Sequence, residues 1–371
     1  MDKLINLKKR YFWGFNILYY LNNDIFYKML GSFLRPKLLR ILVHITNQCN
    51  YNCGYCYVDK TTCSLKPEEW LDLLHQAHRM GVRRIGILGG EPLCEPELLE
   101  RLLVEIKKFK MGTYIYTNGS LLSEIWIEKL KGYNPVLIFK YDIDNQTYQK
   151  LTRQKEYSLS DIEQRIKLCA QKGLRVMTST ALLRDNYSRV REIFDNSLKI
   201  GALPTFERYL PVKGEEVNAV LEISDQEYSW SMQELRECYS SFFKKIGSVA
   251  ARIFGRSCSC YGSLLSVTPT GETLPCPYLP DTVSLGNVRQ ASLKEIHTFF
   301  KKEFTKKYML EARCGRCKDR LECGGGCFTY AYLKKGNFSS NCANKNSLGS
   351  CSYYLMNFLN KRNGIINKVP R

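Results

Sequence analysis

The sequence predicts an α/β protein: a partial barrel of six βα units, followed by a small cysteine-rich domain with little regular structure. Strand-like runs alternate with helical stretches over the first two thirds of the chain. Short glycine-rich or polar motifs follow several of these runs directly. Eight of the 16 cysteines lie between Cys258 and Cys342, beyond the last predicted strand. Alternating strands and helices are typical of a parallel sheet, and the late cysteines indicate a second domain.

Six runs rich in apolar and β-branched residues are the predicted strands. They are Arg40 to Ile45, Arg84 to Leu88, Thr113 to Thr117, Val136 to Asp142, Leu174 to Thr180 and Pro204 to Tyr209. Helical periodicity predicts that the stretches between these strands are helices. In the first such stretch Trp70, Leu74 and Ala77 share one face, and Gly81 ends the helix.

A tight cysteine loop directly follows the first predicted strand. Cys49, Cys53 and Cys56 have the spacing Cys-x3-Cys-x2-Cys, and Tyr57 follows them. Structural zinc sites and ordinary electron-transfer clusters take four protein ligands. Three cysteines without a fourth therefore predict a cluster with one iron open to chemistry. A chance cysteine triplet or a partial zinc site is the alternative interpretation of the same spacing.

This loop resembles the signature of the radical S-adenosylmethionine (radical SAM) enzymes. The resemblance implies a TIM-like partial (β/α)6 barrel in which the three cysteines hold a 4Fe-4S cluster. It also implies that S-adenosylmethionine (SAM) chelates the open iron and is split reductively to a 5'-deoxyadenosyl radical. In the same resemblance Tyr57 is expected near the adenine.

A second motif follows the second predicted strand. Gly89, Gly90 and Glu91 precede a proline, as in the Gly-Gly-Glu-Pro turn of the radical SAM enzymes. Glycines allow a close approach of backbone to ligand, and a carboxylate complements an ammonium group. The resemblance implies that these three residues hold the methionyl amine of SAM.

Other candidate residues lie at the carboxyl ends of later strands, where functional residues of such barrels gather. The fourth strand reads Lys140-Tyr141-Asp142-Ile143 and departs from the family's Ser-x-Asp-Gly pattern. Lys140 is either an inward cation that faces an anionic group or a surface lysine, and it is a catalytic candidate together with Asp142. The candidate contacts to cofactor or substrate at these ends are Thr117, Asn118, Asp142, Ser179, Thr180 and Arg208.

The late cysteines resemble the SPASM extension of radical SAM enzymes, which typically holds two further iron–sulfur clusters. The pattern runs Cys260-x10-Gly-x4-Cys276 and then Cys-x2-Cys-x5-Cys-x3-Cys. By position in the family, Cys260, Cys276 and Cys327 are expected to hold the near cluster, with Cys258 as a possible fourth ligand or an open iron in its place. The outer cluster is expected on Cys314, Cys317, Cys323 and Cys342, with Cys351 as the competitor of Cys342. A zinc site remains the alternative.

Five segments are predicted. They are a helical extension (1–36), the barrel (37–224), a connecting helix (225–257), the SPASM domain (258–356) and a basic tail (357–371). The aromatic N-terminal segment is too interrupted to span a membrane. It is either a helical pair packed on the barrel or an interfacial helix that touches lipid or a hydrophobic partner.

The net charge of +19 is informative about binding partners and not about the fold. An acidic peptide, a nucleic acid, a membrane face and a plain solvated surface all remain possible, but no RNA-binding motif is visible, so nucleic acid is not expected. Metal-type cysteine spacings without a cleavable signal predict a reducing cytoplasm, and oxygen-labile clusters predict an anaerobic or microaerobic host.

Three functions are compatible with these features. The favoured one is a radical SAM/SPASM oxidoreductase that modifies a peptide or protein, with a ferredoxin- or flavodoxin-type electron donor. The second is the same catalyst acting on a small metabolite, as a dehydrogenase or in C–C bond formation. The third is a non-catalytic iron–sulfur electron carrier, which would leave Glu91 and the three-cysteine loop without a use.

Overall fold

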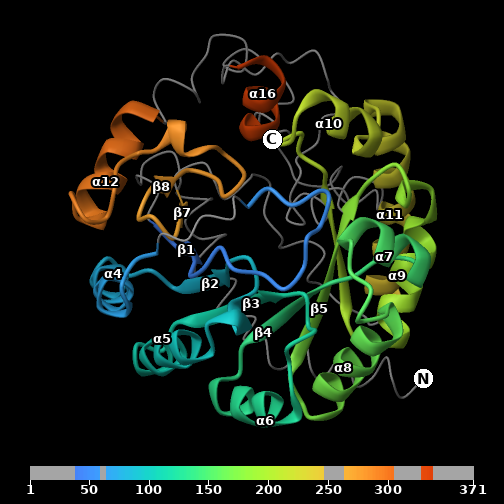
Figure 1. The fold of residues 1–371 in the computed structure, drawn as a ribbon, viewed down its shortest axis with the longest axis horizontal. Coiled ribbons are helices and arrows are strands. Elements are labelled where there is room, and N and C mark those ends of the chain that lie inside the picture. The colour runs from blue at the N-terminus through green and yellow to red at the C-terminus, as the bar shows by residue number, and fades with distance from the viewer. Residues whose placement is uncertain (1–37, 59–63, 246–262, 305–326, 337–371) are drawn as a thin grey trace, which may run out of the picture.

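The computed structural model describes residues 38–58, 64–245, 263–304 and 327–336 (Figure 1). The predictions for the segments 1–36 and 357–371 therefore lie outside the described residues. So do those for seven of the cysteines, which are Cys258, Cys260, Cys314, Cys317, Cys323, Cys342 and Cys351.

One curved sheet organises the described part of the chain. The six predicted strands are all present, as β1 (Arg40–His44), β2 (Arg84–Leu88), β3 (Gly112–Thr117), β4 (Val136–Lys140), β5 (Arg175–Leu182) and β6 (Leu203–Arg208). They pair in parallel in their sequence order, as repeated βα units require. The predicted α/β barrel architecture is confirmed.

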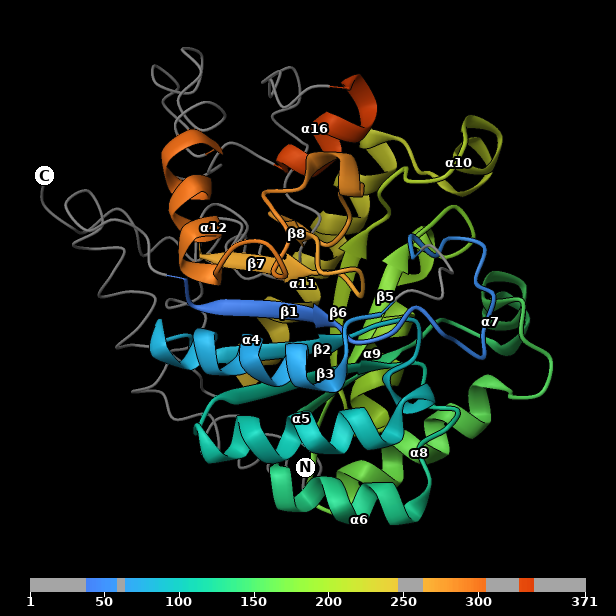
Figure 2. The same cartoon turned by 60° about the vertical axis from the view of Figure 1, so that its left-hand side comes forward.

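The sheet is larger than predicted, because two strands of the cysteine-rich segment join it. β7 (Leu264–Val267) pairs in parallel with β1, and β8 (Thr273–Leu274) pairs antiparallel with β7, so that the sheet has eight strands. Figure 2 shows β7 lying along β1. All four residues of β7 are buried, and this burial stabilises the attachment of the second domain to the barrel.

Helices lie along the outer face of the sheet (Figure 1). Between the strands they are α4 (Pro67–Arg79), α5 (Pro96–Lys108), α6 (Glu124–Tyr133), α7 (Asn145–Thr152), α8 (Leu159–Gln171) and α9 (Val190–Lys199). After β6 come α10 (Glu215–Leu221), α11 (Asp225–Lys245), α12 (Leu293–Phe299) and α16 (Phe328–Lys335). Short 3-10 turns at Pro92–Cys94, Tyr187–Arg189 and Asp281–Val283 and a π-helical turn at Phe300–Phe304 complete the described elements.

α4 illustrates how the sequence specifies these helices. Pro67 occupies the first turn, where its missing N–H costs nothing, and the Glu69 carboxylate accepts from the backbone N–H of Lys66. Trp70, Leu73, Leu74 and Ala77 form the buried stripe. Gly81 then adopts a positive φ of 76°, which ends the helix at the predicted glycine.

Neighbouring residues of each strand point to opposite sides of the sheet. On β5 the Thr178 hydroxyl donates to Ser197 of α9, so Thr178 faces the helices. Ser179 must then face the barrel interior, together with its register partners Lys140 on β4 and Thr205 on β6. In the described ranges no helix is long and apolar enough to cross a membrane.

Candidate active site

The cysteine loop leaves the carboxyl end of β1 and is held by one backbone hydrogen bond to α7 and one within the loop. The N–H of Gly54 donates to the carbonyl of Leu151 on α7, at 3.0 Å, and the N–H of Cys56 donates to the carbonyl of Cys53. The N–H of Tyr51 donates to the Cys49 thiol at 3.4 Å. Burial raises the pKa of the Cys49 thiol to about 12 and also raises that of Cys53. A metal that binds these thiols would favour their ionised form.

The Gly-Gly-Glu turn after β2 lies directly against this loop. The N–H of Gly90 donates to the carbonyl of Thr46 at 2.7 Å, and the N–H of Glu91 donates to that of Gln48 at 2.8 Å. A Cβ added to Gly90 would lie 2.2 Å from the Gln48 carbonyl oxygen. Only glycine permits this approach, so the two motifs form one unit.

The Glu91 side chain is fully buried beneath the loop and is held by three donors. Its carboxylate accepts from the Thr117 hydroxyl at 2.9 Å, from the N–H of Asn118 at 2.7 Å and from the N–H of Leu93 at 3.2 Å. Burial nevertheless raises its pKa to about 7. A buried carboxylate without a cationic partner among these contacts is suited to receive an ammonium group.

Asn118 connects this carboxylate to the cysteines. Its side-chain amide donates to the Asn50 oxygen at 2.9 Å and lies 3.9 Å from the Cys49 sulfur. The structure therefore brings together Cys49, Gly90, Glu91, Thr117 and Asn118, which the sequence places in three separate motifs.

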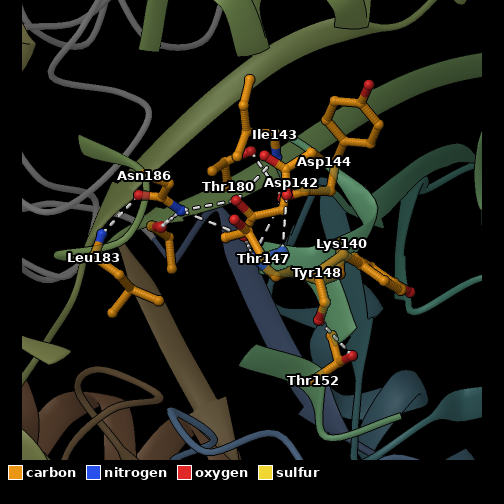
Figure 3. Close-up of polar contacts among 12 residues, drawn as sticks. Lys140, Asp142, Ile143, Asp144, Thr147, Tyr148, Thr152, Thr180, Leu183 and Asn186 are labelled. Carbon is orange, nitrogen blue, oxygen red and sulfur yellow. Dashed lines mark hydrogen bonds and ion pairs between the residues drawn. The ribbon is translucent and has the colours of Figure 1, made fainter. Parts of the chain in front are cut away.

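Asp142 lies beyond β4 and is fully buried. Figure 3 shows its polar contacts. Its carboxylate accepts from the Asn186 amide at 3.0 and 3.3 Å, from the N–H of Ile143 at 3.0 Å and from the Lys140 ammonium at 3.3 Å. Asn186 also donates to the carbonyl of Ala181 and accepts from the N–H of Leu183. This network joins the ends of β4 and β5.

Lys140 points into the barrel, and its side chain is 17% exposed, so it is not a surface lysine. Its ammonium donates to the carbonyl of Tyr141 and lies 4.9 Å from the centre of the Tyr55 ring. Tyr55 stands between Cys53 and Cys56 and was not among the predicted site residues, although its place inside the motif could have indicated it.

Tyr57 faces the interior, where two aromatic rings flank it. The ring centre of His44 lies 5.9 Å away and that of Tyr278 4.6 Å away. Burial raises the pKa of Tyr57 well above its usual range and lowers that of His44 to about 4. The His44 Nε2 atom has no hydrogen-bond partner within the described residues.

Ser179 faces the interior beside Glu207 of β6, a residue that sequence reasoning missed. The Glu207 carboxylate accepts from the Tyr278 hydroxyl at 2.7 Å and from the Ser179 hydroxyl, and burial raises its pKa. Thr180 faces the other way, fully buried, and donates to the carbonyl of Tyr141 at 3.0 Å.

Arg208 follows Glu207 on β6, so its side chain points to the outer side of the sheet. Its guanidinium forms an ion pair with Asp225 of α11 and donates to the Tyr330 hydroxyl of α16 at 2.8 Å. The side chain is 2% exposed.

The three thiols of the cysteine loop are suitable ligands for an iron–sulfur cluster. Cys49, Cys53 and Cys56 are near enough that charge on the other two raises the pKa of Cys49. Cysteine thiolates are the usual protein ligands of such clusters, and three of them would leave one iron of a 4Fe-4S cluster without a protein ligand. Cys276 and Cys327 are likewise free thiols.

Comparison with known proteins agrees with this geometry. The radical SAM superfamily model matches residues 43–196, and the SPASM iron–sulfur cluster-binding domain matches residues 258–318. The subtilosin biosynthesis protein AlbA of Bacillus subtilis is 25% identical over 72% of this chain, which spans 61% of AlbA. The PqqA peptide cyclase of Gluconobacter oxydans is 23% identical over 85% of this chain and 91% of its own length.

Among solved structures, Streptococcus suis SuiB bound to its precursor peptide SuiA has a TM-score of 0.65. The match covers 86% of this chain and 78% of SuiB at 16% identity, which shows a shared fold. The family matches, the curated relatives and the three-cysteine loop beside the buried glutamate lead to one conclusion. This chain belongs to the radical SAM superfamily, as an enzyme that uses SAM and a 4Fe-4S cluster and carries a SPASM domain for auxiliary iron–sulfur clusters.

Proposed function

We propose that this enzyme modifies a peptide or protein by removing a hydrogen atom from it. The observation that carries the radical step is the contact between the cysteine loop and the Gly-Gly-Glu turn, which places Glu91 beside Cys49. Two relatives whose names describe peptide chemistry, AlbA and the PqqA peptide cyclase, support the peptide substrate. When bound, the cluster and SAM together supply the 5'-deoxyadenosyl radical.

Specific residues would hold these groups. Cys49, Cys53 and Cys56 would ligate the cluster, and Gly89, Gly90 and Glu91 would receive the methionyl amine, with Thr117 and Asn118 orienting the carboxylate. Tyr57, Ser179 and Lys140 face the interior and would contact cofactor or substrate. The buried contacts of Asp142 and Thr180 support a positioning role for both.

The first test is reductive cleavage of SAM. Anaerobically reconstituted protein with dithionite should form 5'-deoxyadenosine, and Cys53→Ala should abolish it because one iron loses its ligand. The matched control is Cys169→Ala, which removes a buried thiol of α8 that is assigned to no cluster and should leave cleavage intact. Cleavage that persists in Cys53→Ala would contradict the assignment.

The second test concerns the substrate. Short peptides encoded beside the gene should show a mass change of one or more hydrogen atoms after incubation with enzyme, SAM and dithionite. If those peptides stay unmodified and a metabolite of a neighbouring biosynthetic gene set is converted instead, the peptide proposal fails while the radical SAM chemistry stands.

We also propose a ferredoxin- or flavodoxin-type electron donor in a reducing, anaerobic cytoplasm. Such donors are acidic, and the net charge of +19 favours their encounter with this protein. The described cysteines are all free thiols, which is compatible with that compartment. A rate of SAM cleavage by ferredoxin that falls with added salt would support the electrostatic part of this proposal.

A further inference from the structure

Two neighbouring residues at the carboxyl end of β6 hold different parts of the second domain. Glu207 pairs with Ala181 and Arg208 with Leu182, so the strand alternation sends their side chains to opposite sides of the sheet. Glu207 faces the barrel interior and Arg208 faces the outer layer. Each makes its own contact with a segment that carries one of the predicted cluster cysteines.

On the inner side, Glu207 anchors the segment of Cys276. The Tyr278 hydroxyl donates to its carboxylate at 2.7 Å, and Tyr278 lies only two residues beyond Cys276. The Tyr278 ring also contacts the ring of Tyr57, the residue next to Cys56. This contact therefore fixes the Cys276 segment against both β6 and the first cysteine loop.

On the outer side, Arg208 anchors the segment of Cys327. The Arg208 guanidinium lies between two tyrosine rings, 4.0 Å from the centre of Tyr330 and 4.5 Å from that of Tyr228. The Tyr330 hydroxyl accepts from Arg208 and donates to Glu222 at 3.0 Å.

Tyr330 also contacts the Cys327 thiol through its backbone. Cys327 caps α16, and its sulfur accepts from the backbone N–H of Tyr330 at 3.4 Å. One tyrosine thus connects Arg208 to Cys327. Because such a planar, buried cation between two rings has little freedom to move, the position of Cys327 follows that of β6.

We propose that Glu207 and Arg208 are positioning residues for the near auxiliary iron–sulfur cluster, holding its ligands Cys276 and Cys327 at a set place on the barrel. The inference rests on the proposed assignment of both cysteines to one cluster. The barrel strand then determines the separation of the two thiols, rather than the 50-residue stretch of chain between them. Groups that orient metal ligands typically change metal affinity about 10–100-fold when removed.

The experiment isolates the auxiliary clusters in full-length protein by replacing Cys49, Cys53 and Cys56 with alanine. In this background we compare Arg208→Met, Glu207→Leu and Glu207→Gln by iron and sulfide content. We also compare electron paramagnetic resonance after dithionite reduction, midpoint potential and the rate of iron loss to a chelator. Arg208→Met and Glu207→Leu should lose iron about tenfold faster, with an altered resonance spectrum and a shifted potential.

Two variants act as matched controls. Glu207→Gln keeps an oxygen that accepts from Tyr278 and should restore the parent spectrum. Arg191→Met removes an arginine that binds Glu234 of α11 but no residue of α16 in the described part of the chain, and it should leave the auxiliary signal unchanged.

Several results would overturn the proposal. One is a parent-like spectrum, potential and iron-loss rate in Arg208→Met and Glu207→Leu, even if both melt at lower temperature. Another is found in the protein that keeps Cys49, Cys53 and Cys56. If the only change caused by Arg208→Met there is weaker SAM binding, Arg208 is a cofactor contact. Absence of iron and sulfide from the triple-alanine parent would also overturn it. Because that parent performs no SAM cleavage, its readouts are independent of whether the proposed peptide modification is correct.

Discussion

Replacing Gly90 with alanine tests the unit formed by the two motifs most directly. The added Cβ would lie 2.2 Å from the Gln48 carbonyl oxygen, 2.6 Å from the Gln48 carbonyl carbon and 2.7 Å from the Asn47 carbonyl oxygen. All three atoms belong to backbone, which cannot rotate away. Since non-bonded atoms settle near 3.5 Å, the turn and the cysteine loop must separate by about 1 Å.

This separation has two measurable effects. It stretches the hydrogen bonds from Gly90 to Thr46 and from Glu91 to Gln48, which contribute about 1 kcal/mol each to the free energy of unfolding. It also moves Glu91 relative to Cys49, and a misplacement of about 1 Å can lower a catalytic rate about 100-fold. We therefore expect SAM cleavage to fall by about two orders of magnitude.

The assay is the initial rate of 5'-deoxyadenosine formation under anaerobic conditions, together with thermal unfolding. The matched control is Gly132→Ala in the exposed last turn of α6, where a Cβ meets nothing within 4 Å. That control should keep the rate and gain up to about 1 kcal/mol of stability. A Gly90→Ala protein that cleaves SAM within twofold of the wild-type rate would refute the reasoning.

Two further substitutions, the second with a control, probe buried ionisable groups. Burial lowers the pKa of His44 from its ordinary value of 6.5 to about 4. Between these two pH values the unfolded chain binds a proton that the folded protein does not. The free energy of unfolding therefore falls as the pH drops through that window, by about 1.4 kcal/mol per pH unit. His44→Phe should flatten the pH dependence of the melting temperature between pH 7 and 5.5, and an unchanged slope would contradict this. Asp142→Asn leaves the Lys140 ammonium without its buried partner and should lower the free energy of unfolding by about 3 kcal/mol in a denaturant titration. Asp185→Asn removes only the exposed pair with Lys150 and should cost less than about 1 kcal/mol; equal losses in the two variants would show that burial of the pair is unimportant.

Much of the barrel follows from local pattern. The six strands were predicted within two residues of their ends, because a buried parallel strand is a short apolar run between turn residues. Glu91, Thr117 and Asn118 could be expected together as well, since the carboxyl ends of parallel strands meet at one edge of the sheet. Their distances to Cys49 could not, because those depend on how the cysteine loop returns over the edge.

The attachment of the second domain could not be predicted from local sequence pattern. β7 has four residues, too few to carry a clear period, and its pairing with β1 joins positions more than 200 residues apart. The same holds for Lys140, whose sequence neighbours allow either an inward or a surface position. Its strand register with Ser179 and its contacts with the Asp142 carboxylate and the Tyr55 ring show that its ammonium faces inward.

The sequence by itself determined the chemistry of the first site, because iron ligands and a close backbone approach demand particular residues at particular short spacings. Tertiary structure alone decided the partners of Glu207 and Arg208. Their hydrogen bonds to Tyr278 and Tyr330 span 71 and 122 residues. Contacts of that range follow from how helices and strands pack in three dimensions, and no local spacing along the chain encodes them.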